Sequence, residues 1–173
     1  MPSAEASHEP WKACYSQVAP RLLLFARQWL SAADAEDVVQ TAFVRFWQKY
    51  PTAQAEHYPL LYAAVRNAAI DLIRSNDRRT LREESFHSTH AEPAYFETSL
   101  DRREEADRIQ AALQHLSAEQ RETLVLRIWG ELTFAQIAET LGESINTVAA
   151  RHRYALQALR RILKPNEHER VGV

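Results

Sequence analysis

The chain has 173 residues, of which 46% are hydrophobic and 25% charged, enough for one or two small cores but not for a large one. A single cysteine, Cys14, rules out an internal disulfide and argues against a cysteine-based zinc site, which fits a reducing cytoplasm. No apolar run is long enough to cross a membrane and no signal-peptide core opens the chain, so we expect a cytoplasmic protein.

Apolar residues recur at helical spacing through most of the chain, and β-branched runs are few, so the expected fold is all-α. A first helix carries an apolar stripe that Pro20 is expected to kink or split. The stripe consists of Trp11, Tyr15, Val18, Leu22, Phe25 and Trp29. Ser31 or Asp34 is expected to cap a second helix, which Pro51 stops.

A third helix is expected from about Pro59 towards Arg79. Four polar residues on one of its faces are spaced by four, three and four positions: Asn67, Asp71, Arg74 and Arg78. This spacing lines them up along one stripe of the helix surface.

Charge is segregated along the chain, although the formal net charge is only −2. Residues 58–82 hold five arginines against two acids, whereas residues 83–107 hold eight acids against two arginines. The acidic stretch contains Pro93 and shows no clear periodicity, which is typical of a flexible linker. It is either a solvated tether or a segment that lies along a basic groove on a partner.

This division predicts two small helical domains. We call residues 11–82 the first module and residues 107–164, which contain a helix-turn-helix, the second module; residues 83–106 are the acidic linker. Residues 1–10 and 165–173 are expected to be a disordered N-terminus and a tail. Because the linker offers little apolar surface, we expect the modules to move independently.

The helix-turn-helix is predicted from residues 133–151, TFAQIAETLGESINTVAAR. Ser or Thr precedes each of the last three helices, with Gln three residues later in two cases: Ser117 with Gln120, Thr133 with Gln136, and Ser144. Such pairs form capping boxes, and Gly142 stands where a left-handed turn suits glycine. A motif of this kind normally places its second helix in the major groove of DNA.

Three segments together resemble the extracytoplasmic-function class of bacterial sigma factors. DAEDVVQTAFVRFW resembles the family's region 2.2, LYAAVRNAAIDLIR its regions 2.3 and 2.4, and LSAEQRETLVLRIWGELTFAQIAETLGESINTV its region 4. The resemblance covers nearly all of both modules, and the short linker places the chain in this compact class. It implies a subunit that binds core RNA polymerase, directs it to promoters and helps to open the DNA.

The resemblance also implies two sites on the first module. The region 2.2 helix would bind the polymerase clamp's coiled coil through Asp37, Gln40 and Arg45. The promoter's −10 element would meet Arg66, Asn67, Arg74, Arg78 and Arg79. The loop over residues 50–59 is the candidate for a pocket that holds a flipped base, with His57 or Tyr58 near its exit.

The second module would read the −35 element with the start of its last helix. Its candidate contacts are Asn146, Thr147, Arg151, His152, Arg153 and Tyr154. The sequence departs from the commonest family pattern at Ala149 and Ala150, where Lys or Arg followed by Ser is usual. An alanine cannot donate a hydrogen bond to guanine, so the −35 preference of this chain is not predictable from the pattern.

Other functions fit the sequence less well. We expect no enzyme, no cofactor and no metal site; His87 and His90 in the linker form at best a weak metal pair. A helix-turn-helix regulator that is no polymerase subunit would leave the first module without a role, and a helical interaction protein would bind no nucleic acid. The expected partners are core RNA polymerase and promoter DNA, with an anti-sigma factor as a further candidate and no membrane insertion.

Overall fold

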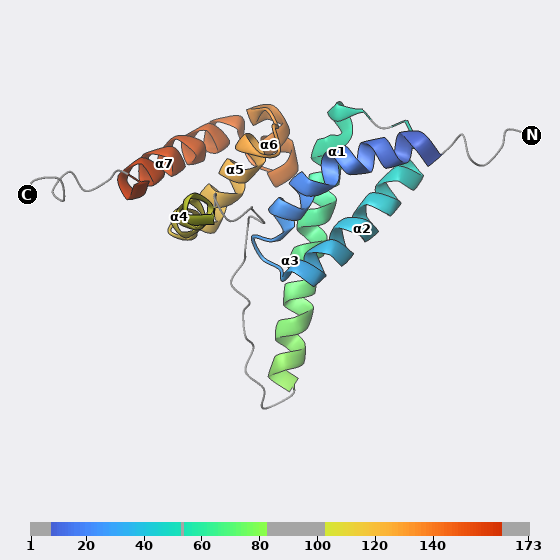
Figure 1. Ribbon diagram of the computed structural model, residues 1–173, viewed down its shortest axis with the longest axis horizontal. Coiled ribbons are helices and arrows are strands. Elements are labelled where there is room, and N and C mark those ends of the chain that lie inside the picture. The colour runs from blue at the N-terminus through green and yellow to red at the C-terminus, as the bar shows by residue number, and fades with distance from the viewer. Residues whose placement is uncertain (1–7, 53, 83–102, 164–173) are drawn as a thin grey trace, which may run out of the picture.

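The computed structural model describes residues 8–52, 54–82 and 103–163, and every regular element in those ranges is a helix (Figure 1). The elements are α1 (His8–Ala26), α2 (Ala32–Lys49), the short 3₁₀ helix η1 (Ala55–His57), α3 (Tyr58–Arg82), α4 (Arg103–Gln114), α5 (Ala118–Ile128), α6 (Phe134–Leu141) and α7 (Ile145–Leu163). The all-α prediction is confirmed. Within the described residues, no helix is both long and apolar enough to cross a membrane.

The first module is a bundle of α1, α2 and α3 (Figure 1). Helix α1 runs through Pro20, so of the two expected effects, a kink or a split, the split does not occur. Pro20 is exposed, whereas Leu22 and Phe25 are fully buried. The packing of these buried side chains keeps the helix continuous, although Pro20 has no N–H group to donate the usual backbone hydrogen bond. Trp29 lies beyond the end of α1 and packs edge-on against Phe25, with 5.0 Å between ring centroids.

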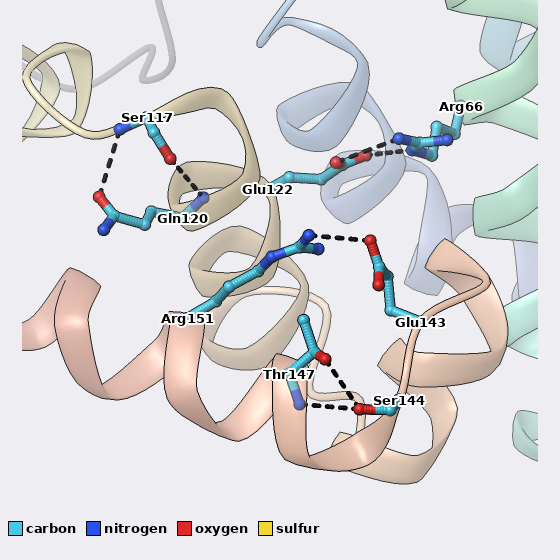
Figure 2. A network of polar contacts seen from close by, with 8 residues as sticks. All are labelled: Arg66, Ser117, Gln120, Glu122, Glu143, Ser144, Thr147 and Arg151. Atoms are coloured by element: carbon cyan, nitrogen blue, oxygen red, sulfur yellow. Dashed lines mark hydrogen bonds and ion pairs between the residues drawn. The ribbon is translucent and has the colours of Figure 1, made fainter.

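The predicted helix caps are confirmed. The Ser31 hydroxyl accepts a hydrogen bond from the Asp34 amide at 3.2 Å, so Ser31 is the residue that caps α2. Both predicted capping boxes form, the first joining Ser117 and Gln120 at the start of α5 (Figure 2). The second opens α6 between Thr133 and Gln136. These local bonds satisfy the amides that a helix start leaves without partners.

The second module comprises α4 to α7, of which α6 and α7 form the helix-turn-helix. Gly142 ends α6 in the left-handed conformation, with φ at 68°. Val148 and Ala155 on α7 are buried against the rest of the module. Helix α4 begins at Arg103, four residues before the expected boundary at 107, and residues 83–102 of the predicted linker lie outside the described residues.

The two modules pack against each other. Helix α3 contacts α6, and α1 contacts α5. Val125 and Leu126 of α5 and Ile137 of α6 are buried in one continuous core with Leu22 and Val65 of the first module. In this structure the two modules are docked through their helices, a contact that the expectation of independent modules did not include.

Replacing Gly142 with alanine tests the turn of the helix-turn-helix. A Cβ atom at this position would meet nothing within 4 Å, so the cost of Gly142→Ala is the left-handed backbone alone, about 1 kcal/mol of unfolding free energy. Urea denaturation followed by circular dichroism measures it. Gly142→Asn is the matched control, since asparagine tolerates this conformation better, and equal stability of all three proteins would contradict the reasoning.

Candidate partner and nucleic-acid interfaces

A groove of about 770 Å³ runs between α2 and α3. Asp37 and Arg45 of α2 line it, and Asn67 of α3 lines it from the other side. Gln40 is exposed on α2 but is not part of the lining. The structure thus brings two of the three predicted polymerase contacts together with one residue predicted to touch the −10 element.

The two walls of this groove differ in chemistry. The α2 wall has Asp37 near its start and Arg45 with Lys49 near its end, whereas the α3 wall includes Leu60 and a run of small residues. That run consists of Ala63, Ala64 and Ala68. A wall of alanines leaves room for a partner backbone to approach closely, while the charges opposite can fix its orientation. These alanines are not among the contacts predicted from the sequence, although the segment AAVRNAA in the third helix signals a helix face of small residues.

The basic stripe of α3 is exposed to solvent. Its members Asn67, Asp71, Arg74 and Arg78 are all exposed, as is Arg79 beside them. The Arg78 Nε donates to the Arg74 carbonyl at 3.1 Å. Arg66 does not belong to this stripe. Its guanidinium faces the second module and forms an ion pair with Glu122 of α5 (Figure 2).

The loop before α3 is closed by its own side chains. His57 Nδ1 accepts a hydrogen bond from the Gln54 amide at 3.2 Å, and its ring lies 5.4 Å from that of Tyr50. The Tyr58 hydroxyl lies 3.9 Å from the Cys14 sulfur of α1. Burial raises the pKa of Tyr58 from its ordinary value, and the neighbouring Cys14 acts in the same direction. Ala53 lies outside the described residues, and the base pocket remains a prediction.

The start of α7 is shaped by its cap. The Ser144 hydroxyl accepts from the Thr147 amide at 3.0 Å and lies 2.8 Å from the Thr147 hydroxyl (Figure 2). Thr147 is therefore part of the cap, while Asn146 beside it is exposed. An exposed amide side chain at a helix N-terminus is well placed to contact a phosphate or a base edge.

The four remaining candidates on α7 fall into two groups. Arg153 and Tyr154 are exposed, with the guanidinium 5.1 Å from the centre of the tyrosine ring. Arg151 instead forms an ion pair with Glu143 at 2.8 Å (Figure 2), a partner that the sequence analysis missed. His152 packs edge-on against Phe134 of α6, with 5.3 Å between ring centroids.

Comparison with known proteins is consistent with this arrangement. Residues 14–79 match the model of Sigma-70 region 2, and residues 112–161 match that of Sigma-70, region 4. The ECF RNA polymerase sigma factor SigL of Mycobacterium tuberculosis is 34% identical over 169 residues, which cover 94% of this chain and 93% of that protein. The chain belongs to the ECF sigma factors.

Two further relatives extend the comparison of this sigma factor. The ECF RNA polymerase sigma factor SigK of Mycolicibacterium vanbaalenii is 25% identical over 92% of this chain and 85% of that protein. The sigma factor RpoE of Bartonella quintana, solved in complex with the anti-sigma factor NepR, has a similar fold, with a TM-score of 0.67 at 24% identity over 91% of this chain and 99% of that one.

Membership of the family establishes the general role. This sigma factor binds core RNA polymerase and promoter DNA and directs the polymerase to promoters. The alternative of a stand-alone regulator is not favoured, because it does not account for region 2. His87 and His90 lie outside the described residues, and the part of the chain that the structure describes contains no cluster of His, Cys, Asp or Glu suited to a metal ion.

The contact of His152 with Phe134 predicts how the stability of the fold depends on pH. The pKa of His152 is lowered, because burial against α6 disfavours the imidazolium and Arg127 repels it. The unfolded chain therefore gains this proton at a higher pH than the folded chain, and stability is lost as the pH falls below about 6.5. We expect the Tm to fall less between about pH 7.5 and about pH 5.5 for His152→Gln than for the unaltered protein, whereas His115→Gln, at an exposed position, should behave like the latter.

Proposed function

We propose that the two modules divide the work of promoter recognition, with the α2–α3 groove holding the polymerase, the α3 stripe contacting the −10 element, and α7 reading the −35 element. The observation that carries the proposal is the adjacency of the groove and the exposed arginines on a single helix, α3. A protein that must hold an enzyme and open DNA beside it needs both surfaces in one rigid unit.

The groove suits a helical segment of the polymerase. Asp37 and Arg45 lie on the same wall with opposite charges, so a partner helix with the complementary pattern would be held in one direction along it. Gln40, exposed on the same helix, would extend the contact surface at the rim. The alanines of α3 would allow the partner's backbone to lie close.

The α3 stripe suits a strand of DNA that has left the duplex. Arg74, Arg78 and Arg79 can neutralise successive phosphates, which is the main source of affinity for nucleic acid. Asn67, at the boundary between groove and stripe, offers both a donor and an acceptor to a base. Opening of the −10 element is thereby proposed to occur next to the polymerase contact.

The −35 contacts are proposed to centre on the exposed side chains of α7. Asn146 and Arg153 can reach a base edge or a phosphate without breaking an existing ion pair, and Tyr154 adds an aromatic face. Arg151 would first have to leave Glu143. His152 is proposed to support the packing of α6, while Ala149 and Ala150 can offer only methyl groups, which suit thymine.

Three finer points complete the proposal. The protein would act where its polymerase is found, in the cytoplasm, and would carry out no chemistry of its own. An anti-sigma factor is proposed as a partner, because the sigma factor RpoE, which has a similar fold, was solved in complex with the anti-sigma factor NepR. CnrH, whose fold is also similar, was solved in complex with the cytosolic domain of CnrY. The proposed module boundaries, 11–82 and 107–164, are those of the sequence analysis.

Reversing one charge in the groove tests the polymerase contact. We expect Asp37→Lys to weaken binding of core polymerase at least tenfold, because it replaces attraction by repulsion at a desolvated contact. Affinity capture of core enzyme by the full-length protein measures this. Glu36→Lys is the matched control, since Glu36 is exposed on the same helix but does not line the groove. Equal loss in both variants would count against the groove.

Truncating Arg153 tests the −35 contact. If Arg153 reads a base edge, Arg153→Ala should cost the holoenzyme about 1–3 kcal/mol of binding free energy and relax the preference at one position. Binding of the reconstituted holoenzyme to a set of promoter variants measures both effects. Arg160→Ala, an exposed position two turns further along α7, should leave the preference unchanged. An unaltered profile for Arg153→Ala would remove this residue from the site.

A further inference from the structure

Helix α7 has two distinct sides near its start. Val148 and Ala155 are buried against the rest of the second module. Arg151 comes three residues after the first of them and four before the second, so it lies on this inward side of the helix. Asn146 and Arg153, seven residues apart on the other side, are exposed. The place of Arg151 along α7 therefore directs it towards the other helices of the module and away from the exposed face.

The Arg151 side chain ends at a carboxylate in the turn of the helix-turn-helix. Its Nη2 donates to Oε1 of Glu143 at 2.8 Å, and only 25% of the arginine side chain is exposed (Figure 2). The Glu143 amide donates to the Ala138 carbonyl of α6 at 3.0 Å. Glu143 is thus tied to α6 through its backbone and to α7 through its side chain.

A third element also faces the Arg151 guanidinium. Figure 2 shows the side chain extending from α7 towards α5, which carries Glu122. Burial raises the pKa of Glu122, whereas its partner Arg66 and then the charge of Arg151 act in the opposite direction. Arg151 therefore lies within electrostatic reach of acids on α5 and in the turn, and its positive charge favours the observed arrangement of these elements around it.

Contact with DNA would require Arg151 to give up this position. Its guanidinium would have to leave Glu143 and turn to the other side of α7, and an unpaired carboxylate would be left beside the phosphates. A negative charge there repels DNA, whereas a paired carboxylate is largely neutralised. A partly exposed ion pair adds little to the stability of a fold, but a charge-assisted hydrogen bond fixes the direction of both groups.

We infer that Glu143 and Arg151 form a positioning pair, which holds the start of α7 against α6 so that Asn146 and Arg153 face outward, and that neither member of the pair contacts a base. The inference rests on the proposed reading of the −35 element by α7. It makes an acid, Glu143, a requirement for tight binding of DNA, although an acid near DNA by itself weakens binding.

Substitution of each partner tests the pair in promoter binding. Holoenzyme reconstituted from core polymerase and the full-length protein is titrated with promoter DNA, at a temperature where circular dichroism shows every variant to be folded. We expect Glu143→Ala and Arg151→Ala each to weaken binding about fivefold, and the double variant no more than either alone, because all three lack the same contact. Arg151→Lys, which keeps a cation within reach of Glu143, should recover most of the affinity.

The base preference and the salt dependence separate positioning from direct reading. Across promoters varied in the −35 element, Arg151→Ala should lower all affinities by a similar factor. The slope of log affinity against log salt should stay unchanged, whereas loss of a phosphate contact reduces its magnitude by about one. Glu139→Ala, which removes an exposed acid of α6, is the matched control for Glu143→Ala and should not weaken binding.

Four results would overturn the inference. Tighter binding by Glu143→Ala would mean that this acid only repels DNA or withholds Arg151 from it. A changed base preference or a smaller salt slope in Arg151→Ala would make the arginine a reader of DNA. Unchanged affinity with a lowered Tm would restrict the pair to stabilising the fold, and additive losses in the double variant would mean that the two residues act separately. A holoenzyme of the unaltered protein that ignores the −35 sequence would instead overturn the proposed role of α7.

Discussion

Leu61, Val65 and Ala69 lie along one side of α3 and are fully buried, and this burial positions the remaining elements of the molecule. Helix α3 contacts α1 and α2 of its own module and α6 of the other. An amphipathic helix of 25 residues can bury one side along its first half and leave its second half in solvent. The groove, the arginine stripe and the contact between the modules all follow from that one placement.

Much of the fold could be predicted from the sequence, because its signals are local. A hydroxyl at the start of a helix and a Gln three residues later satisfy each other's backbone regardless of tertiary context, so the caps at Ser117 and Thr133 could be recognised. Gly142 likewise follows from the chemistry of its own backbone. Pro20 shows the limit of local reasoning, because burial of its neighbours outweighs a rule derived from isolated helices.

The contacts between modules could not be predicted in this way. Arg66 and Glu122 are 56 residues apart, and nothing in the sequence links an arginine in one segment to a particular acid in another. The same holds for His152, whose role depends on where Phe134 arrives after the turn. Residue type and spacing therefore identify candidates for a site, whereas the three-dimensional packing decides which of them are already engaged with other side chains.

Glu131 combines two opposing demands at one position. Its φ of 57° is the one left-handed value among the described non-glycine residues. In the same turn, a Cβ atom at Gly130 would lie 2.6 Å from the Leu126 carbonyl oxygen, so the preceding position has no room for a side chain. A side chain is conformationally costly there, yet it is this side chain that reaches Arg21 in the other module. A glycine at this position would relieve the backbone strain in the turn between α5 and α6, but it would remove the ion pair with Arg21. The strained backbone at Glu131 is therefore accompanied by a contact that fixes the position of the second module relative to the first.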